Sequence, residues 1–213
     1  MTATDEGEYD RNVFINCPFD VDYQTLLHPL LFTVCYLGFT PRIALERCDA
    51  GELRLPRIIR LIRESRYSIH DLSRVRAASS GEFYRLNMPF ELGIEYGCRL
   101  FGPPPLDQKR SLILEREPYH YVHAMSDLGG VDARCHQANG EELVRGVRNW
   151  FVDTAGLRDI ASGTVIWYQF SDFIEDFRAR RMGEGFADED IQTMPIGEFL
   201  GYVREWLWQA ADG

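Results

Sequence analysis

The sequence of 213 residues lacks the features that define several classes of protein. Its five cysteines are odd in number and form no Cys-x-x-Cys pair, so we expect reduced thiols and not a disulfide framework or a zinc knuckle. No run of 18 apolar residues occurs, so no membrane span is predicted. The GxGxxG, Walker A and GxSxG motifs are also absent. A Rossmann dinucleotide site, a P-loop ATPase and a serine hydrolase are therefore not expected.

Charge and composition narrow the choice further. Hydrophobic residues make up 45% and charged residues 26% of the chain, which is ordinary for a globular protein. The formal net charge is −10, and such a chain repels a phosphate backbone, so nucleic acid is not expected as a partner. The first eleven residues are acidic and polar, unlike a signal or transit peptide. We therefore expect a cytoplasmic protein with no membrane partner.

Strand and helix patterns alternate along most of the chain. Short apolar runs predict buried parallel strands at residues 12–17, 41–45, 67–72 and 111–115. Helical spacing of apolar residues predicts helices at 20–37, from 56 onward, 87–101, 140–152, 168–181 and 196–210. The region 119–139 is predicted to be rich in loops. This alternation predicts an α/β, flavodoxin-like parallel sheet with helices on both faces over residues 12–153. Residues 154–213 are predicted to form a C-terminal helical extension packed on it.

In a parallel α/β sheet, ligands bind beyond the carboxyl ends of the strands. In this sequence those ends are Asn16–Asp20, Glu46–Gly51, His70–Arg74 and the region of Glu115. The topology alone therefore predicts a pocket there, before any motif is considered.

Glu91 is the residue of greatest chemical interest. Asn87 is a good N-cap and Pro89 suits a helix start, which places Glu91 in the first turn, where the helix dipole favours an ionised carboxylate. An ionised carboxylate at a pocket edge can act as a nucleophile toward a sugar oxocarbenium ion or stabilise that ion electrostatically. The alternative is that Glu91 only caps the helix. Gly93 and Gly97 are expected to let this helix approach the sheet closely.

The order of these segments resembles a TIR domain. In that family a glycine-bearing loop follows the second strand, here with Gly51, and a helix ending in serine, here Ser65, precedes the third strand. A catalytic glutamate then lies early in the next helix and is usually followed by leucine, here Glu91 and Leu92. The resemblance covers about residues 12 to 150, by the extent of the matched elements.

The same region is similar to the nucleoside 2-deoxyribosyltransferases, which belong to a broader superfamily with the TIR domains. In that family the first strand ends in a Pro-Phe pair, here Pro18-Phe19, and an aspartate closes the third strand, here Asp71. An ELG segment, which begins here at Glu91, carries the nucleophilic glutamate. The resemblance implies that Asp71 assists the leaving base or the ribose.

The two resemblances imply a function and leave alternatives. A TIR-like enzyme would cleave the N-glycosidic bond of NAD at Glu91 and give ADP-ribose or a cyclic product, with NAD as substrate and no cofactor. The implied setting is bacterial antiphage defence, with activity switched on by self-association or by a partner defence protein. One alternative is a deoxyribosyltransferase-like enzyme that exchanges bases on nucleosides or nucleotides. The other is a non-catalytic interaction or sensing module.

Further candidates surround the predicted pocket. Asn16 and Asp20 are placed to bind a ribose or base. One of the arginines that flank Gly51 would bind the phosphates of a dinucleotide, because a guanidinium group can donate two parallel hydrogen bonds to a phosphate. The alternative for each arginine is a solvated helix face. Since strand residues alternate, His70 and Asp71 should face opposite sides of the sheet. The complete set of predicted substrate-binding residues is Asn16, Phe19, Asp20, Arg47, Arg54, His70, Ser73 and Asn87.

Two remaining patterns are interpreted as structural. The only metal-like cluster is formed by His120, His123, Cys135 and His136, and it lacks a confident helix to bring its imidazoles together, so no metal site is predicted. Aromatic residues at helical spacing occur at 168–177 and 199–207, and we expect them to pack these helices on the domain. A self-association surface is the alternative.

Overall fold

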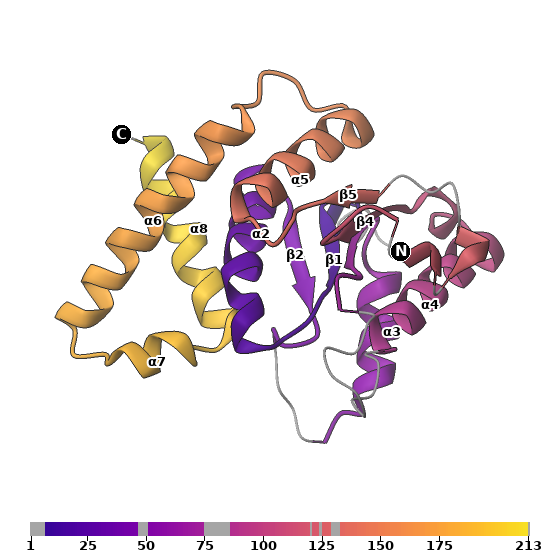
Figure 1. The fold of residues 1–213 in the computed structure, drawn as a ribbon, viewed down its shortest axis with the longest axis horizontal. Coiled ribbons are helices and arrows are strands. Elements are labelled where there is room, and N and C mark those ends of the chain that lie inside the picture. Colours follow the sequence, from indigo (N-terminus) through magenta and orange to yellow (C-terminus); the bar gives the residue numbers. More distant parts are fainter. Residues whose placement is uncertain are drawn as a thin grey trace.

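A computed structural model of the protein describes residues 7–46, 51–74, 86–119, 121–123, 125–128 and 133–212. Its centre is a five-stranded sheet in the order β2-β1-β3-β4-β5, in which every neighbouring pair is parallel (Figure 1). The strands are β1 (Asn12–Asn16), β2 (Thr40–Ile43), β3 (Tyr67–Asp71), β4 (Arg110–Glu115) and β5 (Ala133–Cys135). The order and direction of the strands confirm the predicted α/β, flavodoxin-like fold.

Helices cover both faces of this sheet and extend beyond it (Figure 1). The α-helices are α2 (Gln24–Tyr36), α3 (Arg54–Arg63), α4 (Asn87–Phe101), α5 (Gly140–Ala155), α6 (Gly163–Gly183), α7 (Asp188–Gln192) and α8 (Ile196–Asp212). The described residues also form four 3₁₀ turns, η1 (Val21–Tyr23), η2 (Leu106–Gln108), η3 (Tyr121–His123) and η4 (Ser126–Leu128). The region 119–139, predicted to be rich in loops, also contains the short strand β5, which the sequence analysis did not predict. A three-residue strand is too short to show a periodic pattern.

The alternation of side chains along the strands decides which residues face which helices. In β1, Val13 and Ile15 belong to the core under α2 and α5, whereas Phe14 belongs to the core under α3. Asn16 follows Phe14 and donates a hydrogen bond from Nδ2 to the carbonyl oxygen of Met88, on α4 (2.9 Å). Successive strand residues point to opposite faces, so this register directs Asn16 toward α4.

The helix α2 is buried on two sides, and this explains the C-terminal helices. It carries apolar residues around most of its circumference, which is the pattern of a helix enclosed by other elements. One side faces the sheet, and on the other the Phe32 ring lies 5.6 Å from Phe170, 5.5 Å from Phe173 and 5.9 Å from Trp206, between ring centroids. The sheet, α2, α6 and α8 thus share one core, which confirms that the C-terminal aromatic residues pack on the domain.

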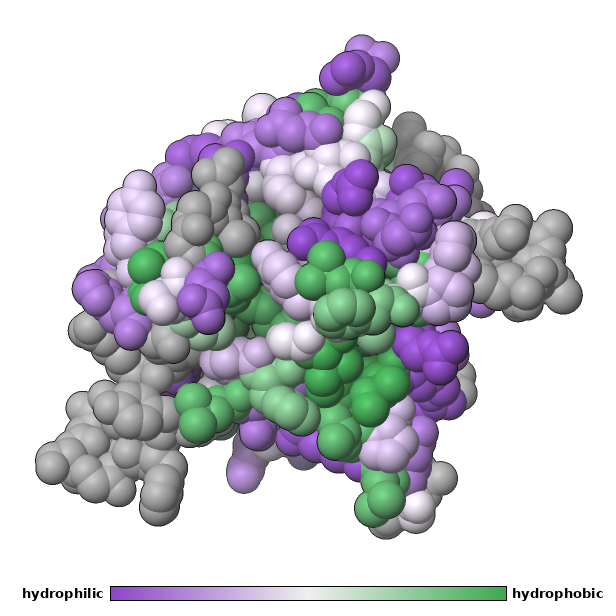
Figure 2. Space-filling view, turned by 90° about the vertical axis from the view of Figure 1, so that its right-hand side faces the viewer, coloured by the Kyte–Doolittle hydropathy of each residue, from purple (hydrophilic) through white to green (hydrophobic). Residues whose placement is uncertain are grey.

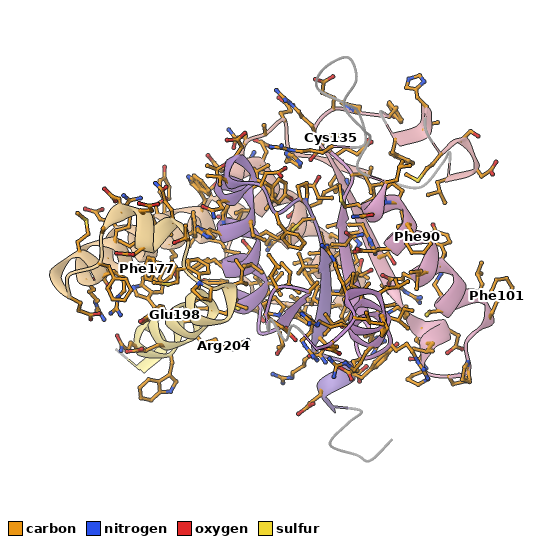
Figure 3. The ribbon with its side chains drawn as sticks, turned by 90° about the horizontal axis from the view of Figure 1, so that it is seen from below. Phe90, Phe101, Cys135, Phe177, Glu198 and Arg204 are labelled. Carbon is orange, nitrogen blue, oxygen red and sulfur yellow. The ribbon has the colours of Figure 1, made fainter. Side chains whose placement is uncertain are left out.

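The outer face of α4 is unusual for its exposed apolar side chains. Phe90, Leu100 and Phe101 are 58%, 63% and 87% exposed. Figure 2 shows the side of the molecule that carries α4, and hydrophobic side chains gather on it. Figure 3 shows Phe90 and Phe101 at the opposite end of the molecule from α8. A side chain added at Gly93 or Gly97 would meet nothing within 4 Å, so the expectation that these glycines bring α4 close to the sheet was wrong. No helix in the described part of the chain is long and apolar enough to cross a membrane.

Candidate functional site

Three acidic or amide side chains reach the carboxyl edge of the sheet from different elements. Asn16 ends β1, Asp71 ends β3, and Glu91 comes from the N-terminal half of α4. Cys17, the residue after β1, is buried and is close enough to both carboxyl groups for their charges to act on it. Burial, and then the charges of Asp71 and Glu91, raise the pKa of its thiol. The predicted position of the site is therefore occupied by groups that can carry chemistry.

Glu91 is a buried carboxyl group with little to stabilise its charge. Glu91 is only 6% exposed, and its carboxyl group forms no hydrogen bond with any residue that the structure describes. Burial raises the pKa of Glu91 to about 7, against the opposing effect of the nearby Arg54 guanidinium. The prediction that the helix start favours the ionised carboxylate did not include this burial, whose effect on the pKa exceeds that of Arg54.

The start of α4 explains why the helix dipole does not lower this pKa. The helix begins at Asn87, with Leu86 as its N-cap, and no side chain caps it. Asn87 is exposed and is the first helical residue, so its predicted role as the N-cap was wrong. The effect of the dipole is concentrated in the first turn of a helix. Glu91 is the fifth residue of α4 and lies beyond that turn.

An arginine and an aromatic ring complete the surroundings of Glu91. The Arg54 guanidinium lies over the Phe19 ring, 5.8 Å from its centroid, and Arg54 itself is exposed at the start of α3. Half-buried Asp20 accepts a hydrogen bond from Arg74 across 2.8 Å. The structure thus brings Phe19 and Arg54 together beside Glu91, and it places Asp20 on the same edge of the sheet.

Asp71 is wholly buried and fully engaged. Its Oδ2 accepts hydrogen bonds from the Tyr23 hydroxyl (2.5 Å) and from His136 Nε2 (3.1 Å), and its Oδ1 accepts one from the Ser73 backbone N–H (2.8 Å). Because the Ala138 N–H donates to Nδ1 of His136, the imidazole proton lies on Nε2 and points at Asp71. Burial alone would raise the pKa of Asp71, but these bonds lower it. This geometry suits a group that positions the strand end.

His70 faces the other side of the sheet, as predicted from the alternation. Its Nδ1 accepts a hydrogen bond from Asn16 Nδ2 (2.9 Å), and its Nε2 donates to Glu95 Oε2 (2.7 Å). The imidazole is wholly buried, so it is not exposed at the sheet edge where a ligand would bind. His70 instead links β1 and β3 to α4.

Glu95 is the centre of a buried polar cluster that the sequence analysis missed. Its Oε1 accepts hydrogen bonds from Ser68 (2.6 Å) and Ser111 (3.0 Å), and Lys109 Nζ lies 3.6 Å from that atom. Burial would raise the pKa of Glu95, but the bond from His70 and the charge of Lys109 help to lower it to about 2. Glu95 lies one turn after Glu91 on α4, so this cluster fixes the helix that carries Glu91. The sole lysine and the i, i+4 pair of glutamates were the signals available in the sequence.

Some predicted residues lie elsewhere. Arg47 and His120 fall outside the described residues. Ser73 is half-buried and uses its backbone to bind Asp71. His136 is bound to Asp71, and no group of three metal-ligating side chains occurs in the described ranges.

Several cavities lined by described residues lie away from Glu91 and Asp71. One of about 450 Å³ lies between β5 and α5, and others of about 850 and 760 Å³ lie beside α3. No protein-family model, curated protein or solved structure matches this chain. Function is therefore inferred from the geometry of the site and from the resemblance in the sequence.

Proposed function

We propose that this protein cleaves the N-glycosidic bond of NAD, with Glu91 as the catalytic residue. The observation that carries the proposal is a carboxyl group, 6% exposed and without a hydrogen-bond partner among the described residues, at the edge of the sheet where ligands bind. An unpaired buried carboxyl group costs stability, so a fold that retains one at such a place favours a functional role. The resemblance to the TIR domains adds the substrate.

The chemistry requires little from the protein beyond charge and position. The bond between C1′ of the ribose and the pyridinium nitrogen breaks, and its electron pair neutralises the positive nitrogen, so nicotinamide leaves as a neutral base. Ionised Glu91 would face C1′ and stabilise the oxocarbenium-like charge that develops there. Water then adds to C1′ and loses a proton, which gives ADP-ribose. If a nucleophile within the ADP-ribosyl group attacks C1′ in place of water as nicotinamide leaves, the product is cyclic.

Two neighbours of Glu91 have roles in this proposal. Arg54 is exposed and close to Glu91, so its guanidinium is placed to pair with the diphosphate. Phe19 offers a half-buried aromatic ring on which a base can stack. Asp71 and His70 act as positioning residues, because described partners occupy both side chains. From the resemblance we extend the proposal to bacterial antiphage defence.

Substitution Glu91→Gln tests the proposal. It keeps the shape of the side chain and removes its charge, so we expect NAD cleavage to fall by about 100-fold or more. The variant should unfold at the same or a higher temperature, because an ionised carboxyl with a raised pKa destabilises the fold as pH rises from 4.5 to about 7. Nicotinamide release is followed by chromatography in dilute and in crowded samples.

The matched control is Glu175→Gln, which changes an exposed glutamate on α6 and should leave cleavage unchanged. Base exchange on deoxynucleosides without loss of NAD would favour the transferase alternative. Equal cleavage by wild type and Glu91→Gln would contradict the role of Glu91.

A second candidate function is a non-catalytic interaction module. The observation that favours it is the outer face of α4, where Phe90, Leu100 and Phe101 are exposed. Exposed apolar patches of this kind mark surfaces that bind other proteins or further copies of the same chain. Under this alternative, the wild-type protein cleaves no NAD at any concentration, and Phe101→Ser changes its assembly.

A further inference from the structure

One of the two cavities beside α3 is not lined by Glu91 and runs along the free edge of the sheet. Its volume is about 760 Å³, which lies within the range of small-molecule sites. The edge strand β2 forms its floor, α3 forms one wall, and the start of α8 forms the other. The described residues that line the cavity include five arginines and three glutamates. They are Arg11, Arg42, Arg57, Arg60, Arg204, Glu8, Glu46 and Glu52.

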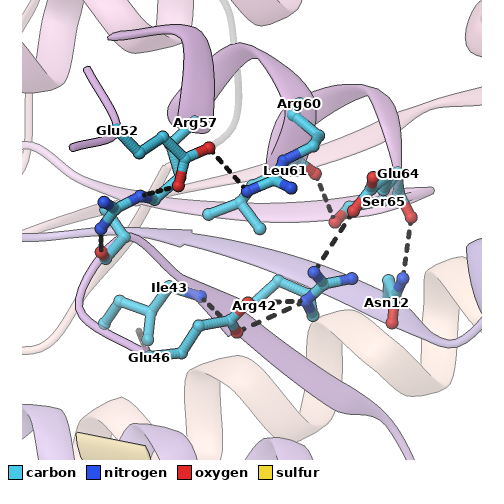
Figure 4. Close-up of polar contacts among 11 residues, drawn as sticks. Asn12, Arg42, Ile43, Glu46, Glu52, Arg57, Arg60, Leu61, Glu64 and Ser65 are labelled. Atoms are coloured by element: carbon cyan, nitrogen blue, oxygen red, sulfur yellow. Dashed lines mark hydrogen bonds and ion pairs between the residues drawn. The ribbon is translucent and has the colours of Figure 1, made fainter. Parts of the chain in front are cut away.

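The cavity has an excess of two positive charges in a chain whose net charge is −10. Three of the arginines are held by ion pairs. Arg57 and Arg60 share Glu52, at 2.8 and 2.9 Å, and Arg42 binds Glu46 at 3.2 Å (Figure 4). These pairs hold the guanidinium groups in place at the wall and floor of the cavity.

The other two arginines, Arg11 and Arg204, have no ion pair with any described residue, and both are exposed. They come from distant parts of the chain. Arg11 is the residue before β1, and Arg204, which is labelled in Figure 3, lies on α8. Like charges brought to one cavity repel each other, so an anion bound between them would relieve the repulsion.

The start of α8 lies close to the backbone at the end of β2, which forms the floor of the cavity. A Cβ atom at Gly197 would lie 2.9 Å from the Glu46 carbonyl oxygen, so only glycine lets α8 approach the end of β2 this closely. Leu200, one turn further along α8, is 2% exposed and belongs to the main core. The helix that carries Arg204 is therefore fixed against the sheet, and the cavity is formed before any ligand binds.

We propose that this cavity binds a small polyanion that carries two or more phosphate groups, with Arg11 and Arg204 as direct ligands. Guanidinium groups match phosphate oxygens in charge and geometry, and several of them spread over one cavity favour several phosphates over one. None of its described lining residues is aromatic, so no ring is available there to stack a nucleobase. Recognition would therefore depend on the phosphates, and the site is separate from the one proposed for NAD.

Tripolyphosphate is the probe that tests the proposal, with ATP beside it. We expect saturable binding of tripolyphosphate by calorimetry at 0.15 M salt, where a Debye length of about 8 Å screens diffuse attraction. The double variant Arg11→Ala/Arg204→Ala should bind it at least 10-fold more weakly. Both side chains are exposed, so this variant should fold like the wild type. ATP, which has the same phosphates and a base, should bind within a few-fold of tripolyphosphate.

The matched control is Arg158→Ala/Arg180→Ala, which removes two exposed arginines outside the cavity and should not change binding. NAD cleavage should be the same in the wild type and in Arg11→Ala/Arg204→Ala. Absence of tripolyphosphate binding, or equal weakening by the control variant, would overturn the proposal. So would loss of the binding in Glu91→Gln, since the polyanion would then occupy the site proposed for NAD.

Discussion

Replacement of Glu95 by alanine is expected to lower the free energy of unfolding by about 3–5 kcal/mol. The carboxylate is wholly buried together with Ser68, His70 and Lys109. Its removal leaves the Lys109 ammonium without its counter-ion and the Nε2–H of His70 without its acceptor. A buried charge or donor that loses its partner retains the full cost of leaving water. Thermal or urea unfolding, followed by circular dichroism, measures the loss.

The pH dependence of stability gives a second readout of the same residue. The pKa of Glu95 is about 2 in the folded protein, below its ordinary value of 4.5. The stabilisation from its charge is therefore fully present above pH 4.5 and is lost as pH falls from 4.5 toward 2. The Glu95→Ala variant should lack this part of the acid destabilisation.

Two further variants keep this prediction falsifiable. Ser111→Ala removes only one hydrogen bond to Glu95 and should cost about 1 kcal/mol, so it serves if Glu95→Ala fails to fold. Glu175→Ala, at an exposed position, should change stability by less than about 0.5 kcal/mol. Equal stability of Glu95→Ala and Glu175→Ala would mean that the cluster does not anchor α4.

Phe32→Ala is expected to cost about 3–5 kcal/mol, although Phe32 lies far from the proposed active site. The residue is wholly buried on α2, and its ring touches three aromatic rings of α6 and α8. The substitution therefore leaves a cavity at the junction between the α/β layers and the C-terminal helices. Urea unfolding at neutral pH measures the change.

Trp208→Ala is the control for Phe32→Ala, because Trp208 is also aromatic but is 67% exposed on α8. Its substitution should change stability by less than about 0.5 kcal/mol. Two separate unfolding transitions in the wild type, with only one affected by Phe32→Ala, would contradict the shared core.

The central fold could be predicted because its signals are local. The strand β1 and the helix α2 are marked by apolar runs and helical spacing, and the order of such segments limits the topology to a parallel sheet. The strand β5 was missed because it has only three residues, two half-buried and one exposed, which are too few to show a periodic pattern. The start of α6 was placed five residues too late, because Ser162, which caps it through a bond to the Val165 N–H, comes before the aromatic residues that were used.

The strand ends that carry Asn16 and Asp71 were predicted from the sequence, but the partners of these side chains were not. Periodicity and topology placed Asn16, Asp71 and Glu91 at one edge of the sheet. The partners of each group depend on contacts between residues far apart in the sequence. Asp71 meets His136 across 65 positions, and no local pattern encodes that bond. The pKa of Glu91 likewise depends on burial by the folded protein, which capping arguments do not include.

The pH dependence of NAD cleavage tests the central claim most directly, because it reports the protonation state of the group that acts. If ionised Glu91 stabilises the developing charge, kcat/KM should rise with pH through a midpoint near 7. In Arg54→Ala the midpoint should move higher, since the charge that lowers this pKa is gone. A profile that is flat from pH 5.5 to 8.5 in the wild type, or the same profile in Glu91→Gln, would contradict the account.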